Sequence, residues 1–299
     1  MTGTRARTIR DLALAYSLLA GPDGADGYAT TPPEFDTGLG ADPDRPLRVG
    51  WLVDPGLGPT DPEIAATVRE AADALRTTGA EVDAVSIPAL ERDNPLDLWN
   101  KLSLLEVKPA FQEITAGDED QMFTYFKFVE SLPDTSMEDY VRAEQGVGRL
   151  RDSFAEYFHS YDLLLLPVTT IPAHEHQLGD FTLNGQTVGA FHVSSTTVPF
   201  NLTGLPALSV RFGTSSDGMP IAVQLASKWY AESTILHSAS LLEALSPVRD
   251  NTPPSETRSA QRAPTAPCHE RRGLAVRALD CLYADTLMTR SSRRWSCAS

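Results

Sequence analysis

The first 245 residues of this 299-residue chain contain no cysteine, because Cys268, Cys281 and Cys297 all lie beyond them. A body without cysteine excludes a thiol nucleophile, a thiolate metal site and a disulfide in that part of the chain. It is compatible with a reducing cytoplasm, and a cytoplasmic location is our prediction.

Basic residues are outnumbered, with 25 Lys+Arg against 40 Asp+Glu and a formal net charge of −15. Residues 246–299 hold nine Arg, no Lys and five acids, a charge of +4, which leaves −19 for residues 1–245. Nucleic-acid binding needs a basic surface that displaces counterions, so we expect no nucleic-acid partner. No stretch approaches the ~20 apolar residues of a membrane span, so we expect no membrane partner.

The first apolar segment combines features of an export signal and of a core helix. Three arginines at positions 5, 7 and 10 precede the apolar run 12–20, as in a signal peptide. Asp11 lies at the head of that run, however, and the apolar residues fall at helical spacing. We therefore predict a core-facing helix that ends at Gly21-Pro22. Its inner face would hold Ile9, Leu12, Ala13, Tyr16, Leu19 and Ala20.

A strand–helix–strand unit is predicted after a loop rich in Gly, Pro, Asp and Thr over residues 21–44. Pro46–Asp54 and Ala80–Ile87 indicate strands. Between them, residues 60–63 (TDPE) have the capping side chain, proline and acid of a helix start, and Gly79 has the position of a helix end. Two parallel strands joined by a right-handed crossover are the expected result. The helix would bury Ile64, Val68, Ala71, Ala72 and Leu75.

The middle of the chain is predicted to be helical over Pro95–Ile114 and Glu119–Leu132. The aromatic residues of these helices either line an apolar pocket or pack in the core, and we favour core packing. They are Trp99, Phe111, Phe123, Tyr125, Phe126 and Phe128. Thr135 and Glu138 then match a capping box that would begin a long helix to about His159.

The rest of the body returns to strands. Tyr161–Val168 is an apolar run suited to a central strand covered on both faces. Ala207–Phe212 and Ile221–Ala226 flank the loop Gly213–Gly218 as in a hairpin, and Glu232–Leu245 predicts a final helix. This alternation of strands and helices makes the body an α/β fold.

The composition changes after Leu245, where Pro, Ser, Thr and Arg predominate, as is typical of a linker. We therefore divide the chain into an α/β domain of residues 1–245 and an Arg-rich, poorly structured tail of residues 246–299. Either a frameshifted reading frame or a genuine added segment would explain this tail.

Several segments, in order, resemble the C-terminal portion of amidase signature family enzymes. Val198–Phe212 is the most specific of them, and its Asn201, Thr203 and Gly204 suit a turn before a strand that Pro206 introduces. The resemblance implies an incomplete mixed β-sheet layered with helices, and amide C–N bond hydrolysis as the family activity. The segments are Gly3–Asp26 (GTRARTIRDLALAYSLLAGPDGAD), 47–87, Tyr161–Pro172 (YDLLLLPVTTIP), Val198–Phe212 (VPFNLTGLPALSVRF), Gly218–Leu225 (GMPIAVQL) and the final helix with Glu232.

The catalytic group that this family uses is missing from the sequence. The resemblance implies a serine nucleophile activated through a second serine and a lysine, all upstream of the helix that opens this chain. Gly-Ser-Ser, Gly-Gly-Ser and Gly-x-Ser-x-Gly do not occur in the chain. Ser194-Ser195 lacks flanking glycines, and Ser215-Ser216 fits a hairpin turn. The only lysines are Lys101, Lys108, Lys127 and Lys228, none in the family's Lys-Asp context, and for Lys101 and Lys108 we expect a solvated surface role.

Other candidate groups also have a simpler interpretation. His174, Glu175 and His176 form a weak metal-ligand pattern, and a surface loop after Pro172 is the preferred interpretation. Two groups of acids indicate solvated faces and helix starts rather than acid/base pairs. They are Glu34, Asp36, Asp42 and Asp44, and Asp118, Glu119 and Asp120.

We therefore predict no catalytic, cofactor-binding or metal-ligating residue in this chain, and no cofactor. The leading interpretation is an amidase-family protein in a truncated form without the Ser-Ser-Lys triad, inactive alone, with a small-molecule amide as the family substrate. The alternatives are a non-catalytic remnant or an interaction module that pairs with a chain carrying the catalytic segment. Such a module would expose strand edges, and either a homo-oligomer or a complementing chain would then be its partner.

Overall fold

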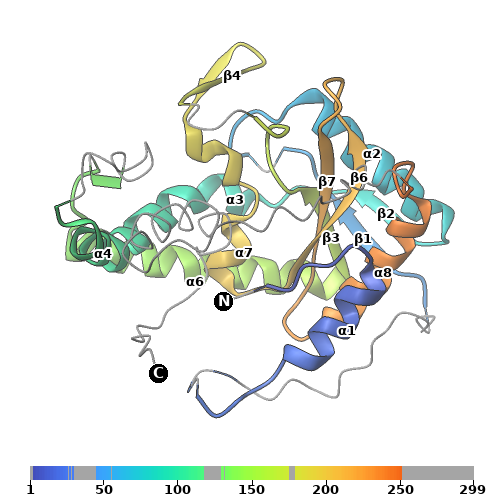
Figure 1. Ribbon diagram of the computed structural model, residues 1–299, viewed down its shortest axis with the longest axis horizontal. Helices are drawn as coiled ribbons and strands as arrows, with labels where there is room; N and C mark the ends of the chain where they lie inside the picture. Colours follow the sequence, from blue (N-terminus) through green and yellow to red (C-terminus); the bar gives the residue numbers. More distant parts are fainter. Residues whose placement is uncertain are drawn as a thin grey trace, which may run out of the picture.

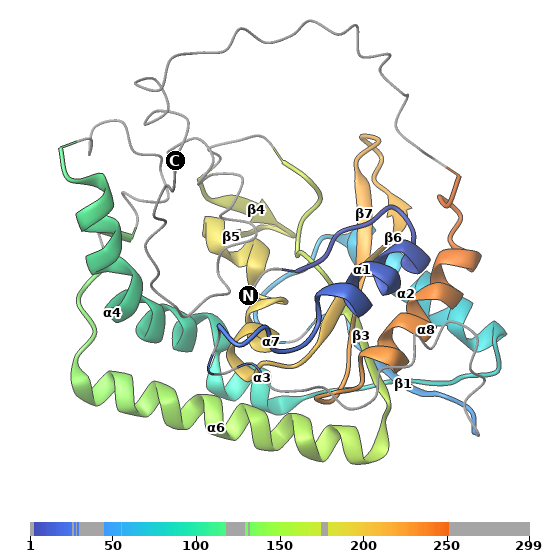
Figure 2. The same cartoon turned by 60° about the horizontal axis from the view of Figure 1, so that its bottom comes forward.

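The computed structural model describes residues 3–25, 27, 29, 45–54, 56–117, 129–130, 132–174 and 179–250. These residues form a five-stranded β-sheet with a layer of helices on each face (Figures 1 and 2), together with a separate two-stranded sheet. The predicted mixed α/β body is therefore confirmed. None of the helices in this part of the chain has the length and apolar character to cross a membrane.

The central sheet is mixed, with strand order β2-β1-β3-β7-β6. Strand β1 runs parallel to both β2 and β3, whereas β7 runs antiparallel to β3 and to β6. The parallel pair β1–β2 is the predicted crossover, and β6–β7 is the predicted hairpin. The strands are β1 (Arg48–Trp51), β2 (Glu81–Ala84), β3 (Leu163–Pro167), β6 (Ala207–Thr214) and β7 (Pro220–Ala226).

Strand β3 lies at the centre and is buried on both faces, as its apolar run predicts. Leu163 and Leu165 enter one core, and Leu164 and Leu166 enter the other. The first core lies under α1 (Ile9–Leu19), α2 (Pro62–Thr77) and α8 (Glu232–Leu245). The second lies under α3 (Pro88–Asp93), α4 (Pro95–Thr115), α6 (Met137–Ser160) and α7 (Val198–Thr203).

The helix boundaries follow local signals in the sequence. Helix α2 begins with Pro62 in its first turn, and the Asp61 side chain accepts a hydrogen bond from the Glu63 N–H at 2.8 Å. Gly79 follows the helix with a φ of +89°. Helix α8 has the predicted bounds, and all five predicted core residues of α2 are buried.

Two local predictions are wrong by a small displacement. The cap of α6 is Ser136, one residue after the predicted Thr135, and its hydroxyl accepts from the Asp139 N–H at 3.1 Å. In α1, Ile9 and Ala13 are buried as predicted, but Leu19 is 73% exposed. Leu19 is the last residue of the helix and points away from the core that its spacing suggested.

The structure also contains elements that were not predicted. The short helices α3 and α7 each begin near a proline, and Gly204 ends α7 with a φ of +73°. A hairpin, β4 (Phe181–Leu183) and β5 (Gln186–Val188), stands apart from the main sheet (Figure 1). Its turn residues Asn184 and Gly185 both have positive φ, as an Asn-Gly hairpin requires.

Several predictions concern residues outside those described. They are the tail from residue 251, most of the 21–44 loop, most of the 119–132 helix, and the second group of acids at 118–120. The division into a 1–245 domain and a tail therefore stays a prediction.

Candidate functional site

The carboxyl ends of the parallel strands β1 and β3 meet at one edge of the sheet, where open α/β sheets commonly bind ligands. A 3-10 helix, η2 (Ala190–Ser194), forms hydrogen bonds with the loop that follows each of these strands. The segment after η2 is in turn hydrogen-bonded to β7. Six buried polar residues lie there, and we call them the carboxyl-edge cluster. They are Thr60, Thr170, His192, Ser195, Thr196 and Gln224.

His192 holds the loop after β1. Its side chain is 6% exposed, and Nε2 lies 2.7 Å from the Pro59 carbonyl oxygen. Because a carbonyl only accepts, Nε2 carries the hydrogen in this contact. The ring packs directly on Gly58, where a Cβ would come within 2.8 Å of the His192 Cε1 atom. The Nε2–H of His192 thus holds the backbone of the loop after β1 in place.

The threonines of the cluster use their hydroxyls in the same way. Thr170 donates to the His192 carbonyl at 3.0 Å, and Thr196 donates to the Val168 carbonyl at 2.7 Å. Gln224 on β7 donates its amide to the Thr196 carbonyl at 3.1 Å. These bonds fasten the segment around η2 to the ends of two strands, so the edge is rigid.

Ser195 differs from its neighbours. Its side chain is fully buried, and its Oγ has no hydrogen-bond partner among the residues that the structure describes. A nucleophilic serine needs an adjacent base within hydrogen-bond reach. Ser194 precedes it at the end of η2 and is half-buried.

The carboxylates near this edge are also occupied by backbone groups. Asp54 accepts from the Gly56 N–H at 2.9 Å, and Asp61 caps α2. Glu63 accepts from the Ser216 N–H at 2.9 Å, which ties α2 to the β6–β7 turn. Ser215 accepts from the Met219 N–H at 3.1 Å within that turn, which is the turn role predicted for this pair.

The lysines lie elsewhere. Lys101 pairs with Asp97 on the surface of α4 at 2.7 Å. Lys108 also lies on α4, donates to the Leu132 carbonyl, and pairs with Asp134 at 3.0 Å. Its side chain is only 16% exposed, so the predicted solvated role is wrong for Lys108. Lys127 lies outside the described residues.

The remaining candidates do not assemble into a site. The His174 ring contacts the Phe181 ring edge-on, with centroids 5.0 Å apart, while Glu175 and His176 are not described. The described residues contain no group of three or more His, Cys, Asp or Glu placed to hold a metal ion. Trp99 is buried; Phe123, Tyr125, Phe126 and Phe128 lie outside the described residues, as do the acids at 34, 36, 42 and 44.

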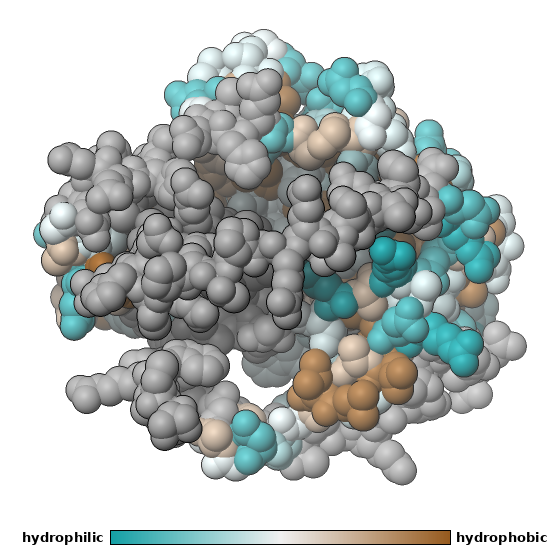
Figure 3. Space-filling model, viewed as in Figure 1, coloured by the Kyte–Doolittle hydropathy of each residue, from teal (hydrophilic) through white to brown (hydrophobic). Residues whose placement is uncertain are grey.

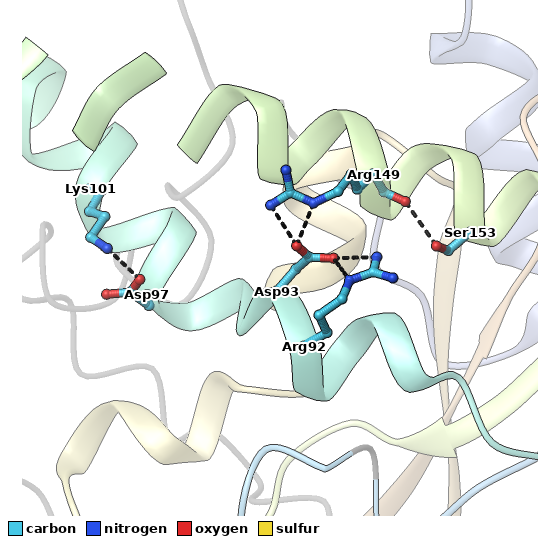
Figure 4. A network of polar contacts seen from close by, with 6 residues as sticks. All are labelled: Arg92, Asp93, Asp97, Lys101, Arg149 and Ser153. Atoms are coloured by element: carbon cyan, nitrogen blue, oxygen red, sulfur yellow. Dashed lines mark hydrogen bonds and ion pairs between the residues drawn. The ribbon is translucent and has the colours of Figure 1, made fainter. Parts of the chain in front are cut away.

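A second network joins α3 to α6 around a buried carboxylate and consists of Arg92, Asp93 and Arg149; we call it the Asp93 cluster (Figure 4). The Asp93 carboxylate is 2% exposed, and it accepts from Arg149 Nε at 2.8 Å and from Arg92 Nη2 at 2.6 Å. Burial alone would raise the pKa of Asp93, but the hydrogen bonds and charges of the two arginines outweigh it and hold the pKa below its ordinary value. Every carboxylate oxygen is occupied, so the cluster is a structural junction.

Comparison with known proteins gives the family. The family model described as Amidase matches residues 1–236. The chain belongs to the amidase family. The amidase relatives include the 6-aminohexanoate-cyclic-dimer hydrolase of Pseudomonas sp. (strain NK87), 30% identical over 271 residues that cover 82% of this chain and 53% of the hydrolase. They also include the acylamidase of Rhodococcus erythropolis, 27% identical over 264 residues that cover 84% of this chain and 53% of the acylamidase. A glutamyl-tRNA(Gln) amidotransferase subunit of Bdellovibrio bacteriovorus is 26% identical, covering 84% of this chain and 56% of its own length.

The amidase fold is also found among solved structures. A bacterial aryl acylamidase of the amidase signature family superposes with a TM-score of 0.70 at 22% identity, over 81% of this chain and 52% of that enzyme. This chain thus spans about half the length of the relatives that it matches.

Proposed function

We propose that this chain forms the part of an amidase that lacks the Lys–Ser–Ser group, and that amide hydrolysis requires an amidase segment carrying that group. The observation that carries the proposal is the carboxyl-edge cluster. Its threonine hydroxyls and its imidazole donate to backbone carbonyls, and the nearby carboxylates accept backbone N–H groups. An arrangement of this kind positions backbone but offers no paired base and nucleophile.

The proposed substrate is a small-molecule amide. The charge of −19 over residues 1–245 speaks against direct contact with RNA, although one relative belongs to a glutamyl-tRNA(Gln) amidotransferase. The cysteine-free body supports a cytoplasmic location.

The test is an amide-hydrolysis assay of the purified 299-residue chain, alone and co-expressed with the part of the Pseudomonas 6-aminohexanoate-cyclic-dimer hydrolase that the match does not span. The substrates are an aryl amide and the cyclic dimer. We expect no turnover above buffer from the chain alone. In the mixture we expect turnover that is lost when the serines of the added segment are replaced, and kept in a Ser195→Ala variant of this chain.

Three results would contradict the proposal. Turnover by the chain alone, abolished by replacing one of its own serines, would place the nucleophile in this chain. A stable complex with the added segment that never hydrolyses an amide would favour the alternative of an interaction module. Absence of both binding and turnover would favour a non-catalytic remnant.

A further inference from the structure

Helix α1 presents an apolar face to solvent. Its inner face is anchored, since Ile9 and Ala13 are buried and Tyr16 hydrogen-bonds Glu232 of α8. On the outer side, Leu14 and Leu18 lie one turn apart and are 59% and 77% exposed. With Leu19 at 73%, they make an apolar patch where α1 lies (Figures 1 and 3). Exposed patches of this kind mark interaction surfaces more often than isolated exposed leucines do.

Strand β6 forms one end of the sheet, and within the described residues no strand pairs with its outer side. The Ser227 N–H donates to the Pro206 carbonyl, so in this antiparallel pair the backbone groups of 206, 208 and 210 face β7. Those of Ala207, Ser209 and Arg211 therefore face outward, and Ala207 and Ser209 are exposed. Among these outward groups, the Arg211 carbonyl accepts from Ser246 Oγ at 3.2 Å.

The leucines of α1 and the outer edge of β6 flank the same helix. At its end, α8 accepts the Ile9 N–H on Glu243 Oε1 at 2.9 Å, and three residues later Ser246 reaches the β6 edge. At its start, Glu232 contacts Tyr16. Helix α1 thus runs along α8, and β6 also packs against α8 (Figures 1 and 2). We call Leu14, Leu18, Leu19, Ala207 and Ser209 the α1–β6 surface.

We propose that the α1–β6 surface binds the amidase segment that carries the Lys–Ser–Ser group, with a strand of that segment added to β6 and apolar side chains laid on α1. This inference rests on the proposed function and names its docking surface. The occupant follows from length: α1 and β6 both lie within the matched residues 1–236, yet the chain spans only 53–56% of the first relatives. Nearly as much chain again lies outside the matched part of those proteins.

The physics of the surface agrees with such an occupant. An eight-residue edge strand whose outer side has no strand partner in the described part of the chain invites pairing with another strand, which supplies backbone hydrogen bonds in register. Burying three leucines adds an apolar contact beside that edge. A ligand that only covered the leucines would leave the outward N–H groups of Ala207 and Ser209 unexplained.

The experiment co-expresses the tagged 299-residue chain with the remaining part of the Pseudomonas hydrolase and measures the amount of that part recovered with the tag. Leu14→Glu/Leu18→Glu places charge on the leucines, and Ser209→Pro removes an outward N–H without touching a bond to β7. We expect each to reduce recovery at least tenfold. Hydrogen exchange of the wild-type complex should slow at the amides of residues 207 and 209.

Two matched controls identify effects that are not local to the surface. Met137→Glu alters a side chain of 72% exposure on α6, in the helix layer on the opposite face of the sheet. Ser209→Ala keeps the N–H that Ser209→Pro removes. Both should bind like wild type, and far-UV circular dichroism with thermal unfolding should show that every variant is folded.

Several outcomes would overturn the inference. They are no recovery with the wild-type chain, recovery unchanged in both surface variants, or equal losses in the controls. Self-association of the wild-type chain that Leu14→Glu/Leu18→Glu abolishes would assign the surface to a second copy. The proposed function can fail separately from this inference. Binding without turnover would support the docking surface and contradict the proposed function. Turnover that the surface variants do not change would support the proposed function and contradict the docking surface.

Discussion

The Asp93 cluster holds a buried carboxylate between two half-exposed arginines, whereas the carboxyl-edge cluster consists of buried side chains, most of which donate to backbone carbonyls. In the first, two arginines surround a carboxylate that is 2% exposed, and they join two helices. In the second, hydroxyls, an amide and an imidazole donate to backbone carbonyls. The helix junction is therefore held by ion pairs, while at the edge where ligands bind in such sheets the buried side chains donate to backbone carbonyls.

This difference has consequences for stability. Neutral bonds of about 1 kcal/mol each can be removed singly, and their number gives the edge its rigidity. A charged cluster responds to pH, because its stabilising effect depends on ionisation. The predictions below separate the two kinds of network.

The largest expected effect is at the carboxyl edge, with Gly58→Ala. The residue has a φ of +117°, and an added Cβ would lie 2.8 Å from the His192 ring. Backbone strain and overpacking together should cost about 2–4 kcal/mol in the free energy of unfolding. Urea denaturation measures this loss. In the double variant Gly58→Ala/His192→Ala the clash with the ring disappears and the backbone strain stays. The loss in the double variant should therefore be smaller than the sum of the two single-variant losses. A loss equal to that sum would refute the contact between Gly58 and the His192 ring.

The Asp93 cluster should show a smaller loss and a pH signature. Asp93→Ala removes the partner of two arginines that are themselves about half exposed. We therefore expect the free energy of unfolding to fall by about 2 kcal/mol, less than the ~3–5 kcal/mol lost when a fully buried pair is broken. The folded-state pKa of Asp93 lies below its unfolded value. Its stabilisation is therefore complete above about pH 4 and is lost as pH falls through the folded pKa.

Asp93→Asn isolates this pH dependence. Urea midpoints measured from pH 7 downward should fall less steeply on the acid side in this variant than in wild type. Some acid slope should remain, because Asp162 also has a lowered pKa: hydrogen bonds from Arg45 and the Arg48 N–H outweigh its burial. Parallel curves for wild type and Asp93→Asn would show that Asp93 does not titrate as described.

Elements with strong local signals could be predicted from the sequence. Asp61 and Pro62 begin α2, Gly79 follows its end, and the apolar run of β3 indicates a strand covered on both faces. The Asn184-Gly185 turn between FTL and QTV has an equally strong signal, which should have predicted the β4–β5 hairpin. Helix α3, only six residues long, has too few turns for a periodic pattern.

The carboxyl-edge cluster could not be predicted in this way. His192 meets Pro59, Thr196 meets Val168, and Gln224 comes from a third segment, so the cluster exists only once the sheet has formed. The absence of the family's serine and lysine motif was visible because a motif is local. The exposed outer side of β6 could not be predicted, because it depends on the order of the strands in the sheet, and no local sequence pattern gives that order.

The smallest effect compares two adjacent buried side chains at the carboxyl edge. Thr196→Val removes the hydroxyl that donates to the Val168 carbonyl and keeps the shape, so it should cost about 1–2 kcal/mol. Ser195→Ala removes a buried hydroxyl that has no described partner, so the free energy of unfolding should change by less than about 0.5 kcal/mol. Urea denaturation of both variants gives the comparison directly. A large loss for Ser195→Ala would mean that its hydroxyl makes a bond that matters for the fold, and equal losses would remove the distinction between bonded and unbonded hydroxyls on which the rigidity of this edge depends.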